Sequence, residues 1–236
     1  HRSTAPGIGF EIDPDKLDGS VRDYLSALAD LAAPDAFDVA LRGFRAGERV
    51  LVDPALAAER IVELIEEGGA SVVLKPDPAR LPRARKNDIE IAGSRAAHLR
   101  DGAAMVRFLH WLDLQPGGTV TEIDAARRLE AFRAETAAND GMPLLDISFD
   151  SIAGAGPNAA LPHYRVNTRS NRTLGDGELF LIDSGAQYRD GTTDITRTVA
   201  IGSVDAERRR KFTLVLKGMI AISTIRFPVG TRGMDL

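Results

Sequence analysis

A proline-rich stretch at residues 75–83 constrains the fold most, because it divides the chain into two regions with different patterns. Three prolines fall within seven residues there, and proline lacks the backbone N–H that helix interiors and central strands use. We therefore predict a linker at this point. It separates a domain of residues 1–82 from a domain of residues 83–236.

The first region predicts a small α/β domain. Residues 49–52 and 71–74 are short apolar runs typical of buried strands, and residues 55–67 between them have a helical composition that ends at two glycines. Strand, helix and strand in this order indicate a βαβ unit. Residues 18–32 predict a further helix of the same domain.

The second region begins with two predicted helices. Asn87 and Glu90 form a capping-box pattern at the start of the first. Apolar residues recur along it at helical spacing, and they predict the face that packs on the core: Ile89, Ala92, Ala96, Leu99, Ala103 and Val106. Thr119 and Glu122 predict the cap of the second helix, which ends near residue 138.

Three β-like segments follow, at residues 144–149, 179–183 and 195–200. A last helix stops before Pro228, and its predicted apolar face consists of Phe212, Val215, Leu216, Met219 and Ile220. Helices first and mainly antiparallel strands after them predict an α+β domain.

The composition excludes several classes of protein. Acidic residues outnumber basic ones by 34 to 30, for a formal net charge of −4, whereas nucleic-acid-binding domains are usually clearly basic. No run reaches the ~18 apolar residues of a membrane span, so we expect neither nucleic acid nor membrane as a partner. The chain has no cysteine, which fits a reducing compartment. It lacks an initiator methionine, and we expect both ends to be cut.

Residues 179–198 hold the most informative pattern, an apolar strand that reaches Asp183 and a second strand that begins near Asp194. If Tyr188 and Arg189 form the tip of a hairpin, the two aspartates oppose each other with Cβ atoms ~5 Å apart. Carboxylates so close repel, and a divalent cation between them relieves the repulsion. The hairpin therefore predicts a metal site, although an arbitrary pair of this spacing more often caps a turn and faces solvent.

The residues around the two aspartates resemble a known family. Asp183-Ser-Gly-Ala-Gln-Tyr, Asp190-Gly-Thr-Thr-Asp-Ile-Thr-Arg-Thr, Gly156-Pro-Asn-Ala-Ala-Leu-Pro-His-Tyr and Asn171-Arg-Thr-Leu are similar to motifs of the aminopeptidase P (Xaa-Pro aminopeptidase) family of creatinase, or pita-bread, metallopeptidases. The resemblance spans roughly residues 49–236. It implies a partial, creatinase-like α/β middle domain followed by the N-terminal part of an α+β pita-bread catalytic domain.

That resemblance implies a metal-dependent peptidase that releases the first residue of peptides whose second residue is proline. Asp183 would ligate one of two divalent ions, commonly Mn²⁺, and Asp194 would bridge both. The ions would hold the hydroxide that attacks the peptide carbonyl. His163 would stabilise the developing oxyanion or bind the substrate. The family also implies a cytoplasmic homodimer.

The chain departs from the family in its remaining ligands. The family completes its site with one His and two Glu from the second half of the catalytic domain. The histidines of this chain are His1, His98, His110 and His163, and Glu207 is its only glutamate after Asp194. None of these lies in a motif that matches the remaining ligands. We therefore expect an incomplete pita-bread domain, and we expect the 236 residues alone to bind metal weakly and hydrolyse nothing.

Two other functions remain open. A prolidase would use the same residues on Xaa-Pro dipeptides, and a non-catalytic pita-bread module would bind peptides or proteins. The presence of Asp183, Asp194 and His163 together favours an enzyme over such a module. His98 and His110 are expected to have buried or interfacial structural roles rather than to bind metal.

Overall fold

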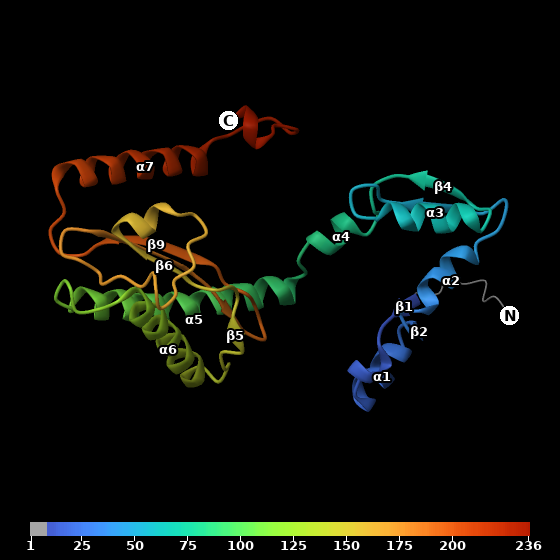
Figure 1. Cartoon of the computed structure of the whole chain (residues 1–236), viewed down its shortest axis with the longest axis horizontal. Coiled ribbons are helices and arrows are strands. Elements are labelled where there is room, and N and C mark those ends of the chain that lie inside the picture. Colours follow the sequence, from blue (N-terminus) through green and yellow to red (C-terminus); the bar gives the residue numbers. More distant parts are fainter. Residues whose placement is uncertain (1–8) are drawn as a thin grey trace. The chain divides into compact units, whose positions relative to one another are not determined.

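The structure, a computed structural model, describes residues 9–236, so His1 lies outside the described residues. The chain divides into two compact units between Arg85 and Lys86 (Figure 1). This division falls three residues beyond the end of the predicted first domain at residue 82. The proline-rich stretch therefore belongs to the end of the first unit.

The first unit contains two parallel strand pairs. Its elements are β1 (Gly9–Glu11), η1 (Pro14–Lys16), α1 (Gly19–Ser26), β2 (Asp30–Ala32), α2 (Ala36–Arg42), β3 (Arg49–Val52), α3 (Glu59–Glu67), β4 (Ser71–Leu74) and α4 (Arg80–Ala84). β1 pairs with β2 and β3 pairs with β4, both in parallel, so the predicted βαβ unit is confirmed. Val52, Ile65 and Ala70 are buried between α3 and its two strands.

Two predictions for this unit were wrong. The helix predicted over residues 18–32 ends at Ser26, and the last residues of that range form β2. The predicted linker contains a short helix, α4, with Pro82 inside it. Pro82 is tolerated because it lies in the first turn, where a backbone N–H has no intrahelical partner.

The second unit begins with two helices, and each is capped at its N-terminus by hydrogen bonds between residues three positions apart. Its elements are α5 (Asp88–Asp113), α6 (Glu122–Asn139), β5 (Asp146–Ile147), β6 (Ile152–Ala155), η2 (Gly156–Ala160), β7 (Leu179–Ser184), β8 (Ala186–Gln187), β9 (Ile195–Ala200), α7 (Ala206–Thr224) and η3 (Gly233–Asp235). The predicted capping box of α5 is confirmed, because Glu90 N donates to Asn87 Oδ1 at 2.9 Å and Asn87 N donates to Glu90 Oε2 at 2.7 Å. The cap of α6 lies two residues later than predicted, since Thr121 and Asp124 form its capping box.

The buried face of α5 differs from the predicted one. Ile89, Leu99 and Val106 are 84%, 79% and 66% exposed. The residues that α5 buries are Ala97, Arg100, Asp101, Ala104, Met105, Phe108 and Leu112. The predicted face was chosen from apolar spacing alone, which leaves out Arg100 and Asp101. Each of these is buried against an oppositely charged partner.

The main sheet of the second unit has the strand order β6-β7-β9, and both pairings are antiparallel, as predicted. α5 and α6 cover one face of this sheet (Figure 1). Buried between the helices and the sheet are Phe108, Leu129, Phe180 and Ile182. β6 is not among the strands predicted from the sequence, and Gly154 lies within it. An added Cβ there would lie 2.8 Å from a backbone nitrogen of η2, so glycine lets η2 pack on the strand.

The last helix is present as predicted, but its apolar face is exposed. α7 begins after Asp205, which caps it, and ends at Thr224. The predicted core residues of this helix are 40% to 74% exposed: Phe212, Val215, Leu216, Met219 and Ile220. Within residues 9–236, no helix combines the length and the apolar character that crossing a bilayer requires.

Candidate metal site

β7 and β9 form the predicted hairpin, but their register differs from the predicted one. Asp183 pairs with Thr196 rather than with Asp194. The same register continues to the turn, where Gln187 is bridged to Thr192. The two aspartates are therefore offset by two residues along the strands instead of being directly opposed.

The shift has a local cause at the turn. Tyr188 N donates to the Gly191 carbonyl at 2.9 Å, so the turn comprises residues 188–191 and is centred one residue later than predicted. The Tyr188 ring is 1% exposed, and burial raises the pKa of its phenol to about 12. Burying this ring favours the later turn over one with an aromatic side chain at an exposed tip.

Asp183 and Asp194 nevertheless belong to the same side of the main sheet. Successive side chains of a strand point to opposite faces, and β7 buries its even-numbered residues against the helices. Asp183 therefore points to the other face, together with its partner Thr196, whose Oγ1 donates to Asp183 Oδ1 at 2.7 Å. Asp194 lies two residues before Thr196, and the same alternation assigns it to that face. We call this side the outer face, with Leu179, Leu181, Asp183, Thr196 and Thr198.

The outer face offers two carboxylates of the kind that hard divalent cations prefer. Diagonal neighbours across antiparallel strands lie ~7–8 Å apart, a separation that two carboxylates bridge through a shared cation and not by direct contact. Asp183 is half-buried and Asp194 is exposed. In the described part of the chain, no three His, Cys, Asp or Glu side chains gather closely enough to hold an ion. The donors fit a divalent ion in kind, and they are too few to complete a site.

His163 is not brought into a group with the two aspartates. It is an exposed residue of the loop that follows η2. Over residues 9–236, no set of three potential ligands includes it with Asp183 and Asp194. The predicted metal pair and the predicted catalytic histidine are therefore carried by separate segments of the second unit.

The loop of His163 is anchored by a buried carboxylate that sequence reasoning assigned to a helix cap. Glu122 is 0% exposed and accepts hydrogen bonds from Tyr164 Oη at 2.8 Å, Asn158 Nδ2 at 2.9 Å and Ala155 N at 2.7 Å. Glu122 thus ties the start of α6 to both ends of the η2 segment, and it fixes Tyr164 next to His163. No sequence signal separates this glutamate from an ordinary acidic residue of a first helical turn.

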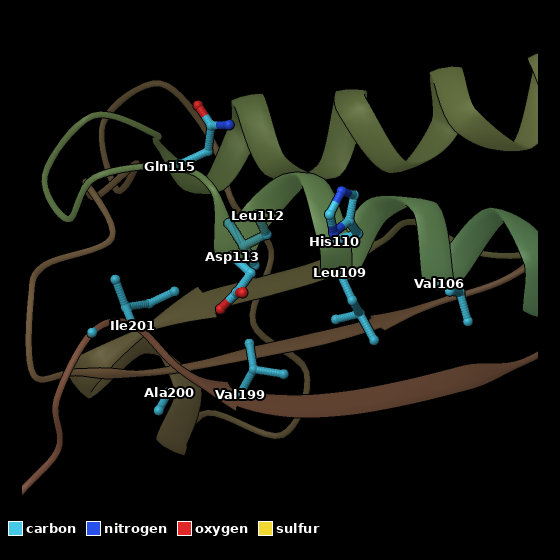
Figure 2. Close-up of a pocket in the computed structure, with 10 residues that line it drawn as sticks. Val106, Leu109, His110, Leu112, Asp113, Gln115, Val199, Ala200 and Ile201 are labelled. Atoms are coloured by element: carbon cyan, nitrogen blue, oxygen red, sulfur yellow. The ribbon is translucent and has the colours of Figure 1, made fainter.

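A separate cavity of about 460 Å³ lies on the opposite side of the sheet (Figure 2). Leu109 and Asp113 of α5 point toward Val199 of β9 there (Figure 2). Because Val199 belongs to the helix-facing side of the sheet, this cavity is not part of the outer face. His110 lines it but is exposed, and His98 is exposed with Nδ1 2.7 Å from Ser94 O. Neither histidine is therefore buried, and an interfacial role for them stays a prediction.

The family comparison covers most of the second unit. Residues 92–236 match the model of metallopeptidase family M24. The matched range includes His163 and both aspartates, whereas β1 to β4 lie before it.

Several proteins named as aminopeptidases are similar to this chain. The probable Xaa-Pro aminopeptidase P of Paracoccidioides brasiliensis (strain Pb18) is 44% identical over 174 residues, which cover 72% of this chain and 27% of the relative. Aminopeptidase P1 of Arabidopsis thaliana is 36% identical over 211 residues, which cover 80% of this chain and 32% of the relative. The chain thus spans about a quarter to a third of the length of these relatives.

Solved structures show the same likeness. The X-prolyl aminopeptidase of Caenorhabditis elegans, described as a cytosolic enzyme with a di-nuclear active site, is similar with a TM-score of 0.80 and 32% identity, covering 97% of this chain and 38% of that one. The prolidase of Pyrococcus furiosus is similar with a TM-score of 0.62 and 20% identity, covering 85% and 56%. The second likeness concerns the fold alone.

Proposed function

The chain belongs to metallopeptidase family M24, and from this membership we propose that it carries part of the active site of an Xaa-Pro aminopeptidase. The reaction is the release of the N-terminal residue from peptides whose second residue is proline. The observation that carries the proposal is the pairing of β7 with β9, which turns Asp183 and Thr196 to the outer face. Continuing the alternation by two residues from Thr196 assigns Asp194 to the same face, and both aspartates fall within the matched range. Relatives that are 36% and 44% identical and named for this activity support it.

The predicted fold class is confirmed, with an α/β region followed by the pita-bread fold of this family. We propose that residues 1–82 form a creatinase-like middle domain and that residues 83–236 are part of the catalytic domain. The parallel βαβ unit of the first and the antiparallel sheet of the second support this assignment.

We propose two divalent ions, Mn²⁺ in particular, as cofactors of the complete site. Carboxylates are hard donors that suit Mn²⁺, and the C. elegans relative is described as having a di-nuclear active site. Bound ions would supply a water of lowered pKa and a Lewis acid for the peptide carbonyl. Asp183 would ligate one ion and Asp194 would be shared by both. A complete site needs ligands in addition to these two.

His163 is proposed to bind the peptide carbonyl oxygen as negative charge develops on it. An imidazole N–H is a suitable donor for that oxygen, and one such donor is typically worth ~10²–10³ in rate. Its exposure on a loop whose base is fixed by Glu122 supports access of a peptide to the ring. His163 would therefore orient the substrate and stabilise charge.

Peptides with a penultimate proline are the proposed partners, and nucleic acid is not proposed for a chain with a net charge of −4. We propose a cytoplasmic location, which the description of the C. elegans relative as a cytosolic enzyme supports. Homodimer formation stays a prediction.

Hydrolysis of a tripeptide with proline second, compared with hydrolysis of an Xaa-Pro dipeptide, tests the proposal. With Mn²⁺, the natural protein that contains this chain should release the first residue of a tripeptide with proline second, and Asp183→Asn and Asp194→Asn should abolish this release. His163→Ala should lower it ~10²–10³-fold. The 236 residues alone should hydrolyse nothing, because their two carboxylates do not complete a site.

Other outcomes point to the alternatives. Hydrolysis of an Xaa-Pro dipeptide, with no release from the tripeptide, would favour a prolidase. Peptide binding by the natural protein without any hydrolysis would favour a non-catalytic module. Hydrolysis that survives both aspartate substitutions would contradict the proposed site.

A further inference from the structure

Thr193, directly before Asp194, joins the hairpin to a buried carboxylate of α5. Thr193 is 1% exposed, and its Oγ1 donates to Asp101 Oδ2 at 2.8 Å. The same oxygen accepts from Ala186 N at 3.0 Å, and Thr193 N donates to the Ala186 carbonyl at 2.9 Å. One hydroxyl group therefore connects the strand that leads to Asp194, the strand that leaves Asp183, and the long helix.

The Asp101 carboxylate is held in one orientation, because both of its oxygens accept hydrogen bonds inside the core. Arg133 of α6 donates Nε to Asp101 Oδ1 at 2.6 Å and Nη2 to Oδ2 at 3.1 Å. The Asp101 and Arg133 side chains are 0% and 1% exposed. Bidentate pairs of this kind are geometrically specific, so the carboxylate that receives the Thr193 hydroxyl cannot rotate without breaking the pair.

A second contact fixes the turn of the same hairpin on α5. Arg100 donates Nη1 and Nη2 to the two carboxylate oxygens of Asp190, both at 3.0 Å. An added Cβ on Gly93 of α5 would lie 2.3 Å from the Asp190 carbonyl oxygen, so helix and turn are in close backbone contact. The hairpin is therefore held at its turn and again at Thr193.

We propose that Asp101 is a positioning residue for Asp194, and that it acts through the Thr193 hydroxyl; this inference rests on the proposed metal site. A slip of one residue in an antiparallel pair moves every side chain to the other face, and Asp194 lies outside β9 itself. Its place on the outer face therefore depends on the residue before it. The contact of Thr193 with Asp101 and Ala186 sets that place, and with it the affinity of the aspartate pair for a divalent ion.

Two threonine substitutions separate this role from general effects on the hairpin. Thr193→Val keeps the shape of the side chain and removes the hydroxyl, whereas Thr193→Ser keeps the hydroxyl. Thr192→Val is a matched control, because the neighbouring Thr192 is exposed and its hydroxyl donates only to Gln187 Oε1 at 2.7 Å. Each variant of the 236-residue chain is titrated with Mn²⁺, and free Mn²⁺ is measured by electron paramagnetic resonance.

Thr193→Val should weaken Mn²⁺ binding ~10–100-fold, the range typical of losing a group that orients a metal ligand; here the orientation passes through the backbone between Thr193 and Asp194. Thr193→Ser and Thr192→Val should stay within about threefold of the unsubstituted chain, which is well below that range. Asp194→Asn reports on the proposed metal site itself. If Asp194→Asn loses binding while Thr193→Val retains it, the positioning role is overturned and the metal site stands. Undiminished binding by Asp194→Asn would refute the site and the role together.

Amide hydrogen exchange in the unsubstituted chain gives a measurement that does not depend on any variant folding. The Ala186 amide should exchange as slowly as the amides of β7, because the Thr193 hydroxyl accepts its hydrogen bond inside the core. Exchange of Ala186 at the rate of the exposed loop after η2 would contradict the contact on which the proposal rests.

Discussion

Neutralising Asp101 should destabilise the second unit far more than neutralising Glu135, although both carboxylates join the same two helices. The Asp101–Arg133 pair links α5 to α6 at 2.6 Å, with side chains 0% and 1% exposed. The Arg107–Glu135 pair links the same helices at the same 2.6 Å, with side chains 42% and 47% exposed. The two pairs thus have the same shortest distance and differ strongly in burial.

The difference in burial sets the expected magnitudes. Asp101→Asn leaves Arg133 charged and uncompensated in the core, and breaking a buried pair in this way costs ~3–5 kcal/mol. Glu135→Gln removes an exposed attraction worth ~0–1 kcal/mol. At about 2–4 °C of Tm per kcal/mol, Asp101→Asn should lower Tm by roughly 6–20 °C and Glu135→Gln by at most about 4 °C.

Tryptophan fluorescence measures this for the second unit alone, because Trp111 is the only tryptophan of the chain and lies on α5. Urea unfolding followed at Trp111 gives the free energy of unfolding of each variant. If Asp101→Asn costs less than about 1 kcal/mol, the range of an exposed pair, the argument that burial makes this pair expensive to break is refuted.

Two further perturbations test how the hairpin is seated on α5. Gly93→Ala should lower the free energy of unfolding, because the added Cβ would lie 2.3 Å from the Asp190 carbonyl oxygen. Gly102→Ala should raise the free energy of unfolding by about 0.5–1 kcal/mol, because a Cβ added at this position of the same helix would have no atom within 4 Å. If urea unfolding shows that both substitutions change the free energy in the same direction, the contact of Gly93 with Asp190 is contradicted. The hydrogen bond from Arg100 holds the pKa of Asp190 below its ordinary value. The stability from this pair is therefore present above the ordinary carboxyl pKa and lost as the pH falls through the lowered one. Arg100→Gln should flatten the dependence of unfolding free energy on pH in that acidic window, and an unchanged profile would count against the pair.

Elements marked by local signals could be predicted from the sequence. Asn87 and Glu90 lie at cap positions whose hydrogen bonds involve only neighbouring residues. The strands β3, β4 and β9 have the predicted bounds. β6 was missed because its sequence, Ile-Ala-Gly-Ala, consists mostly of small residues that carry no strand preference. It becomes a strand through its pairing with β7.

Features that depend on distant partners could not be predicted. Asp101 and Glu122 are charged residues that a pattern of apolar spacing assigns to the surface, and each is buried by bonds to residues more than thirty positions away. The predicted hairpin register was wrong for a similar reason. The prediction placed Tyr188 at the tip of the hairpin, whereas its side chain is buried in the core. The candidate aspartates were identified by their motif, and their relative position required the structure.

The central claim is that Asp183 and Asp194 hold a divalent cation together on the outer face of the sheet. Paramagnetic broadening of backbone amide NMR signals by Mn²⁺ tests it most directly in the 236-residue chain. The account predicts broadening centred on residues 183 and 194, and its loss in the double variant Asp183→Asn/Asp194→Asn. Broadening that is centred elsewhere, or that survives the double substitution, would contradict the claim.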